Sequence, residues 1–367
     1  MKAFELKRYK PDRKTQQRIK RRLARIARHG GMRRLRKRYL PSRRVVDGDG
    51  RRRNPTQRRP YVIATPLVRA PQCLSAVKNP NQMSQFIGEL KHALTTSPKV
   101  RVDLSYVTDL AADGVALLLK HISDPRLVQN ARVVGTEPLD PISRQKLIDS
   151  GFYTYVLSPR GRIGPTDAIS VIARKSERVD NEIAAKVRQQ ATKWLYTHDR
   201  TAPSLYASLI ECMANTRNHA HRNTGARNVS TEHETWWLAV SRDVTRRAIC
   251  VAFIDTGVGL FESVKLRGIA SQMRRLFGRY PNTQILKDML RGEITSRTGL
   301  PYRGKGLPKI YNHLLRGDFS KLIFVTNDVF ADVGADDYRT ITPPFAGTLI
   351  YWEIKGDIID VCNPNSE

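Results

Sequence analysis

The stretch VAFIDTGVGLFES at positions 251–263 constrains the fold of this chain more than any other short segment. Its first four residues have the apolar character of a buried strand, and they run directly into Asp255. Gly257 and Gly259 follow, and glycine allows backbone conformations that other residues rarely adopt. The pattern predicts a buried strand that ends in a carboxylate and a tight turn. An ordinary strand and turn is the alternative interpretation, because aspartate and glycine are common turn residues.

Length and composition limit the class of protein. The chain has 367 residues, of which 40% are hydrophobic, so it can form two domains with real cores. It has no apolar run of the roughly 20 residues that a membrane helix needs, and its first residues lack the apolar core of a signal peptide. The four cysteines are scattered and form no metal-binding pair. We therefore expect a cytoplasmic protein with reduced thiols and no membrane segment.

Most of the positive charge belongs to residues 1–60, which we interpret as a basic N-terminal extension. They contain 24 lysines or arginines and four acids, and so carry +20 of the formal net charge of +30. Positions 11–31 have the capping residues and spacing of a basic helix, with a narrow apolar stripe at Ile19, Leu23 and Ile26. The turn-rich remainder predicts an arm that is flexible or ordered by a partner.

This extension has three interpretations: a solvated tail, an anionic-lipid anchor and a nucleic-acid-binding arm. The apolar stripe offers little area to insert into lipid. Dense arginine and lysine can instead replace the counterions along a phosphate backbone. The sequence therefore favours nucleic acid, either DNA or RNA, as the partner of residues 1–60.

From about Tyr61 the sequence alternates between strand-like and helix-like segments, which predicts an α/β layer with a covered sheet. No cluster of catalytic residue types occurs in this part of the sequence. The predicted strands are 61–68, 99–110 and 131–135, and the predicted helices are 81–94, 111–122 and 140–152.

Positions 100–122, VRVDLSYVTDLAADGVALLLKHI, followed by LIDSGF, resemble a STAS domain, the fold of anti-sigma-factor antagonists. The resemblance covers about residues 61–160, and we place the domain at 61–165. In phosphorylated relatives, a serine at the start of the helix takes the phosphate. This chain has Ala112 at that position, which has no hydroxyl. The resemblance therefore implies an interaction or scaffold module for a protein partner, without the phospho-switch.

A second domain is predicted from about residue 175, with helical periodicity over 175–196 and again over 204–221. Glu211 and Asn215 in the second helix are four residues apart, so their side chains emerge one turn apart on one face. Taken alone, they are equally compatible with a common solvated pair. The apolar face of this helix, which should pack on a sheet, consists of Leu205, Leu209, Cys212 and Met213.

Three further motifs follow in order. A predicted hairpin at 235–260 ends in the Asp-x-Gly-x-Gly turn, a Gly-x-Gly-Leu sequence opens a predicted helix at 302–314, and a Gly-Thr pair opens a final strand at 345–354. Together with the Glu-x-x-x-Asn helix, this ordered set is similar to the GHKL family, the ATP-binding (Bergerat) fold of gyrase and the histidine kinases. The resemblance covers about residues 175–356.

The two resemblances define the predicted fold class, α/β in the broad sense that includes α+β. A basic helical arm precedes a STAS-like α/β domain, and a GHKL-type two-layer α/β sandwich follows it. Residues 357–367 are a predicted C-terminal tail. We expect no downstream domain of the kind that supplies a phosphate-sensing lysine in gyrase-like members.

The GHKL resemblance implies a role for each motif residue at the base end of an ATP site. Asp255 accepts a hydrogen bond from the adenine amino group, and a carboxylate in that place rejects a guanine carbonyl. Gly257 and Gly259 let the backbone pass close to the base and ribose. Thr348 supports the adenine end through its hydroxyl.

The phosphate end is implied in the same way. Asn215 matches the family's magnesium ligand, a neutral oxygen suited to a hard cation. Glu211 matches the residue that polarises the attacking water in ATP-hydrolysing members. The segment 260–302 is the predicted lid. The second glycine box, whose amides and helix start meet phosphate, comprises Gly304, Lys305, Gly306 and Leu307.

Two classes of function follow from these motifs. The first is an ATP–Mg switch or ATPase that acts on or within a nucleic-acid-containing assembly, with a homodimer forming on ATP binding. The second is an anti-sigma or serine-kinase-like regulator of a protein partner, which the STAS resemblance favours and the missing phosphoserine disfavours. A binding protein with a degenerate pocket is a third interpretation. The sequence leaves open whether ATP is hydrolysed or held.

Overall fold

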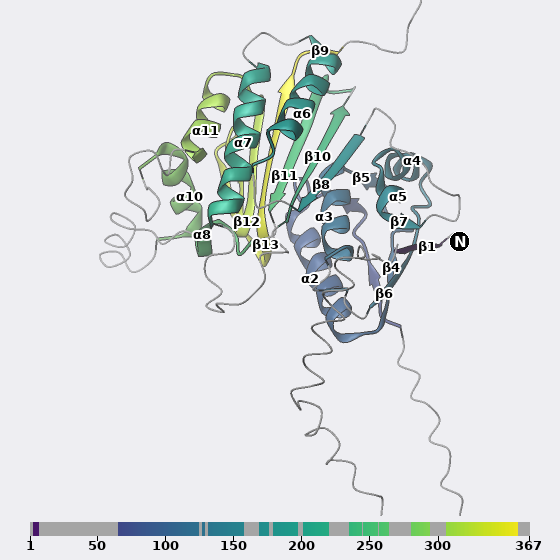
Figure 1. Ribbon diagram of the computed structural model, residues 1–367. Helices are drawn as coiled ribbons and strands as arrows, with labels where there is room; N and C mark the ends of the chain where they lie inside the picture. Colours follow the sequence, from purple (N-terminus) through teal and green to yellow (C-terminus); the bar gives the residue numbers. More distant parts are fainter. Residues whose placement is uncertain are drawn as a thin grey trace, which may run out of the picture. The chain divides into compact units, whose positions relative to one another are not determined.

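In the computed structural model of the chain, the described residues form a mixed α/β structure with two five-stranded sheets (Figure 1). One sheet combines parallel and antiparallel pairs, and the other is antiparallel throughout. None of the helices in this part of the chain has the length and apolar composition of a bilayer span. The described residues are 3–6, 65–124, 127–128, 131–157, 169–175, 179–196, 201–219, 235–243, 245–255, 257–263, 280–293 and 306–358.

The N-terminal sheet has the strand order β2-β4-β6-β1-β7. β2, β4 and β6 are parallel, as expected of an α/β layer, whereas β1 is antiparallel to both of its neighbours. Exposed and buried residues alternate at the start of β4, so one face of the sheet packs inward. The strands are β1 (Ala3–Leu6), β2 (Leu67–Arg69), β4 (Lys99–Asp103), β6 (Arg132–Thr136) and β7 (Val156–Leu157).

Strand β1 belongs to the stretch that the sequence analysis assigned to the basic extension. Its Ala3 lies opposite Thr136 of β6, and its Leu6 lies opposite Val156 of β7. The basic segment 7–64 therefore connects two strands of one sheet and is not a terminal arm. Four residues between lysines give too short a pattern to predict a strand. The predicted basic helix at 11–31 lies outside the described residues.

Two long helices cover the inner face of this sheet, in agreement with the predicted helices at 81–94 and 111–122. α2 (Pro80–Thr96) begins with proline in its first turn, where the missing N–H costs no helical bond. α3 (Ala112–Ile122) begins directly after β5. The smaller elements of this layer are β3 (Cys73–Leu74), β5 (Asp109–Leu110), α4 (Pro141–Asp149) and α5 (Phe152–Tyr155).

All eleven residues of α3 are buried, including the charged ones. A helix that is buried on every side lies inside a larger core rather than on a surface. The Asp113 carboxylate accepts hydrogen bonds from Ala76 N at 2.7 Å and from Ser75 Oγ at 3.1 Å. Burial raises the pKa of Asp113, and these hydrogen bonds oppose that shift. The start of α3 is therefore fixed to the β3 loop by a buried polar contact.

The C-terminal sheet has the order β12-β13-β11-β10-β8. Its strands are β8 (Ile169–Lys175), β10 (Thr235–Asp243), β11 (Ala248–Asp255), β12 (Lys321–Asp332) and β13 (Asp337–Lys355). Helices cover one face of it (Figure 1). They are α6 (Asn181–Trp194), α7 (Thr201–His219), α10 (Asn282–Arg291) and α11 (Gly306–Leu315), with the short α8 (Leu260–Ser263) next to β12. β9 (Leu195–Tyr196) and β14 (Asp357–Ile358) form a separate pair.

Both faces of this sheet are covered. Trp236, Leu238 and Phe253 join the core formed with the helices just named. Their neighbours Trp237 and Ala252 point the other way and join the core of α2 and α3. The sequence predicts a two-layer sandwich here. The structure adds a third layer, because a second face of α3 is buried against the C-terminal sheet.

Gly114 tests how closely α3 packs. A Cβ at this position would lie 2.0 Å from the Leu74 carbonyl oxygen. Gly114→Ala should therefore lower the free energy of unfolding by about 1–3 kcal/mol, the scale for overpacking a core. Gly88 in α2 is the matched control, because a Cβ there meets no atom within 4 Å. Gly88→Ala should stabilise the protein by about 0.5–1 kcal/mol, and urea unfolding of both variants measures the contrast. Equal stabilities would contradict this packing.

Candidate functional site

Helix α7 presents two polar side chains beside a buried apolar face. Glu211 and Asn215 are half-buried on this helix, and Thr216 Oγ1 bonds back to the Cys212 carbonyl at 3.1 Å. The predicted apolar face is confirmed, since each of its members is at most 2% exposed. These members are Leu205, Leu209, Cys212 and Met213. Because that face is fixed on the sheet, Glu211 and Asn215 are held toward the start of α11.

The first residue of α11 lies against these two side chains. A Cβ on Gly306 would lie 2.9 Å from Glu211 Oε2 and 3.3 Å from Asn215 Nδ2. A side chain at this position would displace the ends of the Glu211 and Asn215 side chains. Leu307 is 8% exposed and joins the core that contains Leu209, which anchors the first turn of α11. Three predicted site residues that are far apart in the sequence therefore meet at one place.

Lys309 is a further member of this cluster that the sequence analysis missed. Its ammonium forms an ion pair with the Glu211 carboxylate, and both side chains are partly exposed. The available signal was its place in the first turn of α11, three residues after Gly306. At that position its positive charge lies beside the helix start, where anions are stabilised. The cluster combines a carboxylate, an amide, a lysine and a helix N-terminus.

Asp255 ends β11 as the sequence predicts, and it faces Thr348 in the register of β13. Its Oδ1 accepts a hydrogen bond from Gly257 N at 2.7 Å, which fixes one carboxylate oxygen against the turn. Thr348 is 6% exposed. The carboxylate and the threonine therefore lie together at one end of the C-terminal sheet.

Two residues of β12 hold the turn that follows Asp255, and the sequence analysis missed both. The first is Asn327, whose Oδ1 accepts from Phe261 N at 3.2 Å and whose Nδ2 donates to the Val258 carbonyl at 2.9 Å. Gly259 has φ +88°, and a Cβ there would lie 2.3 Å from Asn327 Oδ1. Glycine is required here because both the backbone angle and the close contact exclude a side chain.

Thr326 is the second of these residues and is fully buried. Its Oγ1 accepts from Leu260 N at 2.9 Å and lies 3.2 Å from Thr348 Oγ1. A hydroxyl has one proton, and the acceptors within reach of Thr326 are the Gly347 carbonyl at 3.2 Å, Thr348 Oγ1 at 3.2 Å and Asn327 Oδ1 at 3.4 Å. The predicted threonine is thereby linked to the start of α8.

Both ends of the site act electrostatically on Cys212, which belongs to the buried apolar face of α7. Burial raises the pKa of the Cys212 thiol, and the carboxylates of Glu211 and Asp255 raise it further. The thiol is therefore neutral and unreactive at physiological pH. Its sensitivity to both carboxylates agrees with the packing of α7 on β11.

Part of the predicted site falls outside the described residues. Gly304, Lys305 and most of the predicted lid (264–279 and 294–302) are in that group. The lid segments that are described are α8 and α10, and α10 packs on α11 and β12. Gly292 ends α10 in the left-handed conformation, with φ +77°, which makes it a helix cap.

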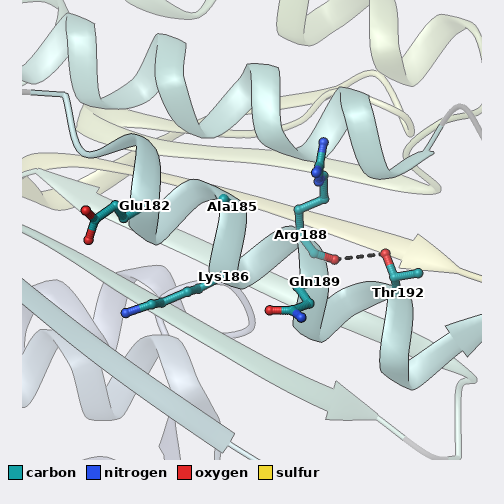
Figure 2. A pocket seen from close by; sticks show the side chains of 6 residues that line it. All are labelled: Glu182, Ala185, Lys186, Arg188, Gln189 and Thr192. Atoms are coloured by element: carbon teal, nitrogen blue, oxygen red, sulfur yellow. Dashed lines mark hydrogen bonds between the residues drawn. The ribbon is translucent and has the colours of Figure 1, made fainter.

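A separate hollow of about 570 Å³ lies on the outer surface of α6 (Figure 2). All of its lining residues belong to that one helix, and none is a predicted site residue. Its wall is a helix face rather than a convergence of elements. The lining residues are Glu182, Ala185, Lys186, Arg188, Gln189 and Thr192.

The residues of the site differ in how well they suit a metal ion and a nucleotide. Within the described part of the chain, no group of three or more His, Cys, Asp or Glu side chains could hold a metal by itself. A single Asn215 oxygen fits Mg²⁺, which keeps several waters and takes its remaining ligands from phosphates. The amides at the start of α11 suit an anion, as helix N-termini do in general.

Comparison of the sequence with protein-family models finds no match, and comparison with curated proteins finds no relative. The interpretation of the site therefore depends on its own residues and geometry.

Proposed function

We propose that this chain is an ATP–Mg-binding protein of the GHKL type, either a switch or an ATPase. We further propose that it acts on or within a nucleic-acid-containing assembly through its basic segment. One observation carries the nucleotide proposal, which is the contact of Gly306 with Glu211 and Asn215. The same sheet and helices also bring Asp255 opposite Thr348. These two contacts support the proposal, because they involve described residues of the four motifs that carry the GHKL resemblance.

The base end is suited to adenine. An ionised carboxylate only accepts hydrogen bonds, so Asp255 pairs with an exocyclic amino group and rejects a carbonyl. The Gly257 bond to Oδ1 and the Asn327 contacts hold this acceptor and the following turn in place. Preorganisation of this kind lowers the ordering cost of binding.

The phosphate end combines a helix start with oxygen and cation groups. The first amides of α11 and Lys309 favour anionic oxygens, and Asn215 contributes a neutral oxygen for a cation. When bound, Mg²⁺ would be held by Asn215 and would offset the charge of the phosphates. Glu211 would accept a proton from water in this proposal, and its ion pair with Lys309 orients the carboxylate. We therefore propose a role in chemistry for Glu211 and a role in binding for Asn215.

The regulator of a protein partner is the second candidate. Three exposed apolar side chains support a docking role for the N-terminal layer, namely Tyr106, Leu139 and Ile142. Leu139 N donates to the Ser105 carbonyl at 3.1 Å, so it lies beside the turn that carries Tyr106. A phospho-switch at the start of α3 is disfavoured, because Ala112 is buried and has no hydroxyl. Transfer of label from ATP to a partner protein would favour this second candidate.

The base end is tested by Asp255→Asn. The amide can donate where the adenine amino group also donates, so ATP binding should weaken by about 1–3 kcal/mol, the scale for an unpaired buried polar group. Asp337→Asn, in an exposed part of β13, is the matched control and should bind normally. Calorimetric titration measures both. Unchanged affinity in Asp255→Asn would remove this residue from the site.

Substitutions of Glu211 and Asn215 in α7 test nucleotide binding and hydrolysis separately. Glu211→Gln should leave ATP binding intact and lower any phosphate release by about 10²–10⁴-fold, the contribution of a general base. Asn215→Ala should weaken the magnesium-dependent binding itself. Glu182→Gln, an exposed change in the α6 hollow, should affect neither. If both α7 variants hydrolyse ATP at the parental rate, this face of the helix is structural.

The basic segment is tested by charge removal, because deletion of residues 1–60 would also remove β1. Four arginines of the predicted helix are changed to glutamine, which should reduce the log–log salt slope of DNA or RNA binding by about 0.7–0.9 for each phosphate that is no longer neutralised. An unchanged slope would exclude this helix from binding. The four arginines are Arg21, Arg22, Arg25 and Arg28. The control removes the exposed charges of Lys186, Lys193, Arg316 and Lys355 and should leave the slope unchanged.

A further inference from the structure

Lys120 lies on α3 and is only 7% exposed. An ammonium group is costly to bury unless it gains hydrogen bonds in return. Its Nζ donates to two backbone carbonyls, that of Asp255 at 3.3 Å and that of Ala346 at 3.2 Å. It also lies 5.9 Å from the ring centroid of Phe345. A side chain of the N-terminal layer thus obtains these hydrogen-bond partners from the C-terminal sheet.

These two carbonyls are at the base end of the candidate site. Asp255 is the last residue of β11, and Ala346 precedes the Gly347–Thr348 pair of β13. The ammonium therefore joins the two strand segments whose side chains face each other across the register. It contacts the backbone of the residue whose carboxylate is proposed to select the base.

Gly347 leaves the space for this contact. Its φ is +98°, a conformation that favours glycine. A Cβ there would lie 2.4 Å from the Asp255 carbonyl oxygen and 3.3 Å from Lys120 Nζ. The glycine of the Gly-Thr motif is therefore needed for the approach of β13 to Asp255 and Lys120.

We propose that Lys120 is a positioning residue for the base end of the nucleotide site, through which α3 and nucleotide binding are coupled. This inference rests on the proposed ATP function. The ammonium fixes the Asp255 backbone, and the carboxylate direction is fixed in turn by the Gly257 hydrogen bond. Because such coupling is reciprocal, a nucleotide at Asp255 stabilises the packing of α3, and a partner that shifts α3 changes nucleotide affinity.

The test uses the full chain and Lys120→Met, which keeps an unbranched side chain one atom shorter and removes its donors. Asn81→Ala is the matched control, because Asn81 Oδ1 accepts a hydrogen bond from Thr342 N, a polar contact between the same two layers. That contact does not involve the Asp255 turn. Affinities for Mg–ATP and Mg–tripolyphosphate are measured by calorimetry, and amide hydrogen exchange over 251–261 is followed without ligand.

Lys120→Met should weaken Mg–ATP binding by about tenfold, a typical size for coupling between sites. It should leave Mg–tripolyphosphate binding unchanged, because the Lys120 hydrogen bonds to the Asp255 and Ala346 carbonyls are at the base end. General destabilisation would lower both affinities together. The variant should also speed exchange over 251–261, and Asn81→Ala should do neither. An unchanged Mg–ATP affinity together with unchanged exchange would overturn the proposal.

Measurements on the unmodified chain distinguish a failure of the proposed ATP function from a failure of the Lys120 proposal. If it does not bind Mg–ATP, the proposed function fails, and the exchange rates over 251–261 still decide whether Lys120 holds the turn. If it binds Mg–ATP, the ligand should slow amide exchange in α3 as well as at the turn. Binding without any protection of α3 would overturn the coupling, even where Lys120→Met does not fold.

Discussion

The antiparallel pairing of β11 with β13 is the interaction on which the candidate site depends. It places Asp255 opposite Thr348 and fixes the register, because a slip of either strand by one residue would turn all side chains of that strand to the opposite face. Both faces of the sheet are buried, so such a shift would disrupt two cores at once. The position of the turn after Asp255 is fixed by this pairing. Hydrogen bonds to Thr326 and Asn327 also hold the turn on β12.

The second constraint is the double burial of α3. This helix belongs to the core of the N-terminal sheet and also covers the C-terminal sheet. Its polar residues are matched to that position, with Asp113 bonded to the β3 loop and Lys120 bonded to the ends of β11 and β13. The two layers therefore share one core, and the N-terminal layer is part of the environment of the candidate site.

The sequence predicts the elements better than their contacts. The helical periods of α2, α3 and α7 and the strand that ends at Asp255 are local patterns, and they are found where they are predicted. Strand β1 could not be predicted, because it has only four residues and its partners β6 and β7 lie more than 100 residues further along the chain. Lys309, Thr326, Asn327 and Lys120 were also missed, since their roles arise from tertiary contacts. Gly306 lies between these two cases. Its motif predicts that it belongs to the site, whereas its contact with Glu211 and Asn215 is seen only in the structure.

The most direct test of the central claim is a calorimetric titration of the full chain with Mg–ATP and with Mg–GTP. An acceptor-only carboxylate at the base end and a glycine helix start at the phosphate end predict one Mg–ATP site per chain. Binding should depend on magnesium, and Mg–GTP should bind much more weakly. The absence of Mg–ATP binding, or equal affinities for the two nucleotides, would contradict the assignment of Asp255 and with it the proposed nucleotide site.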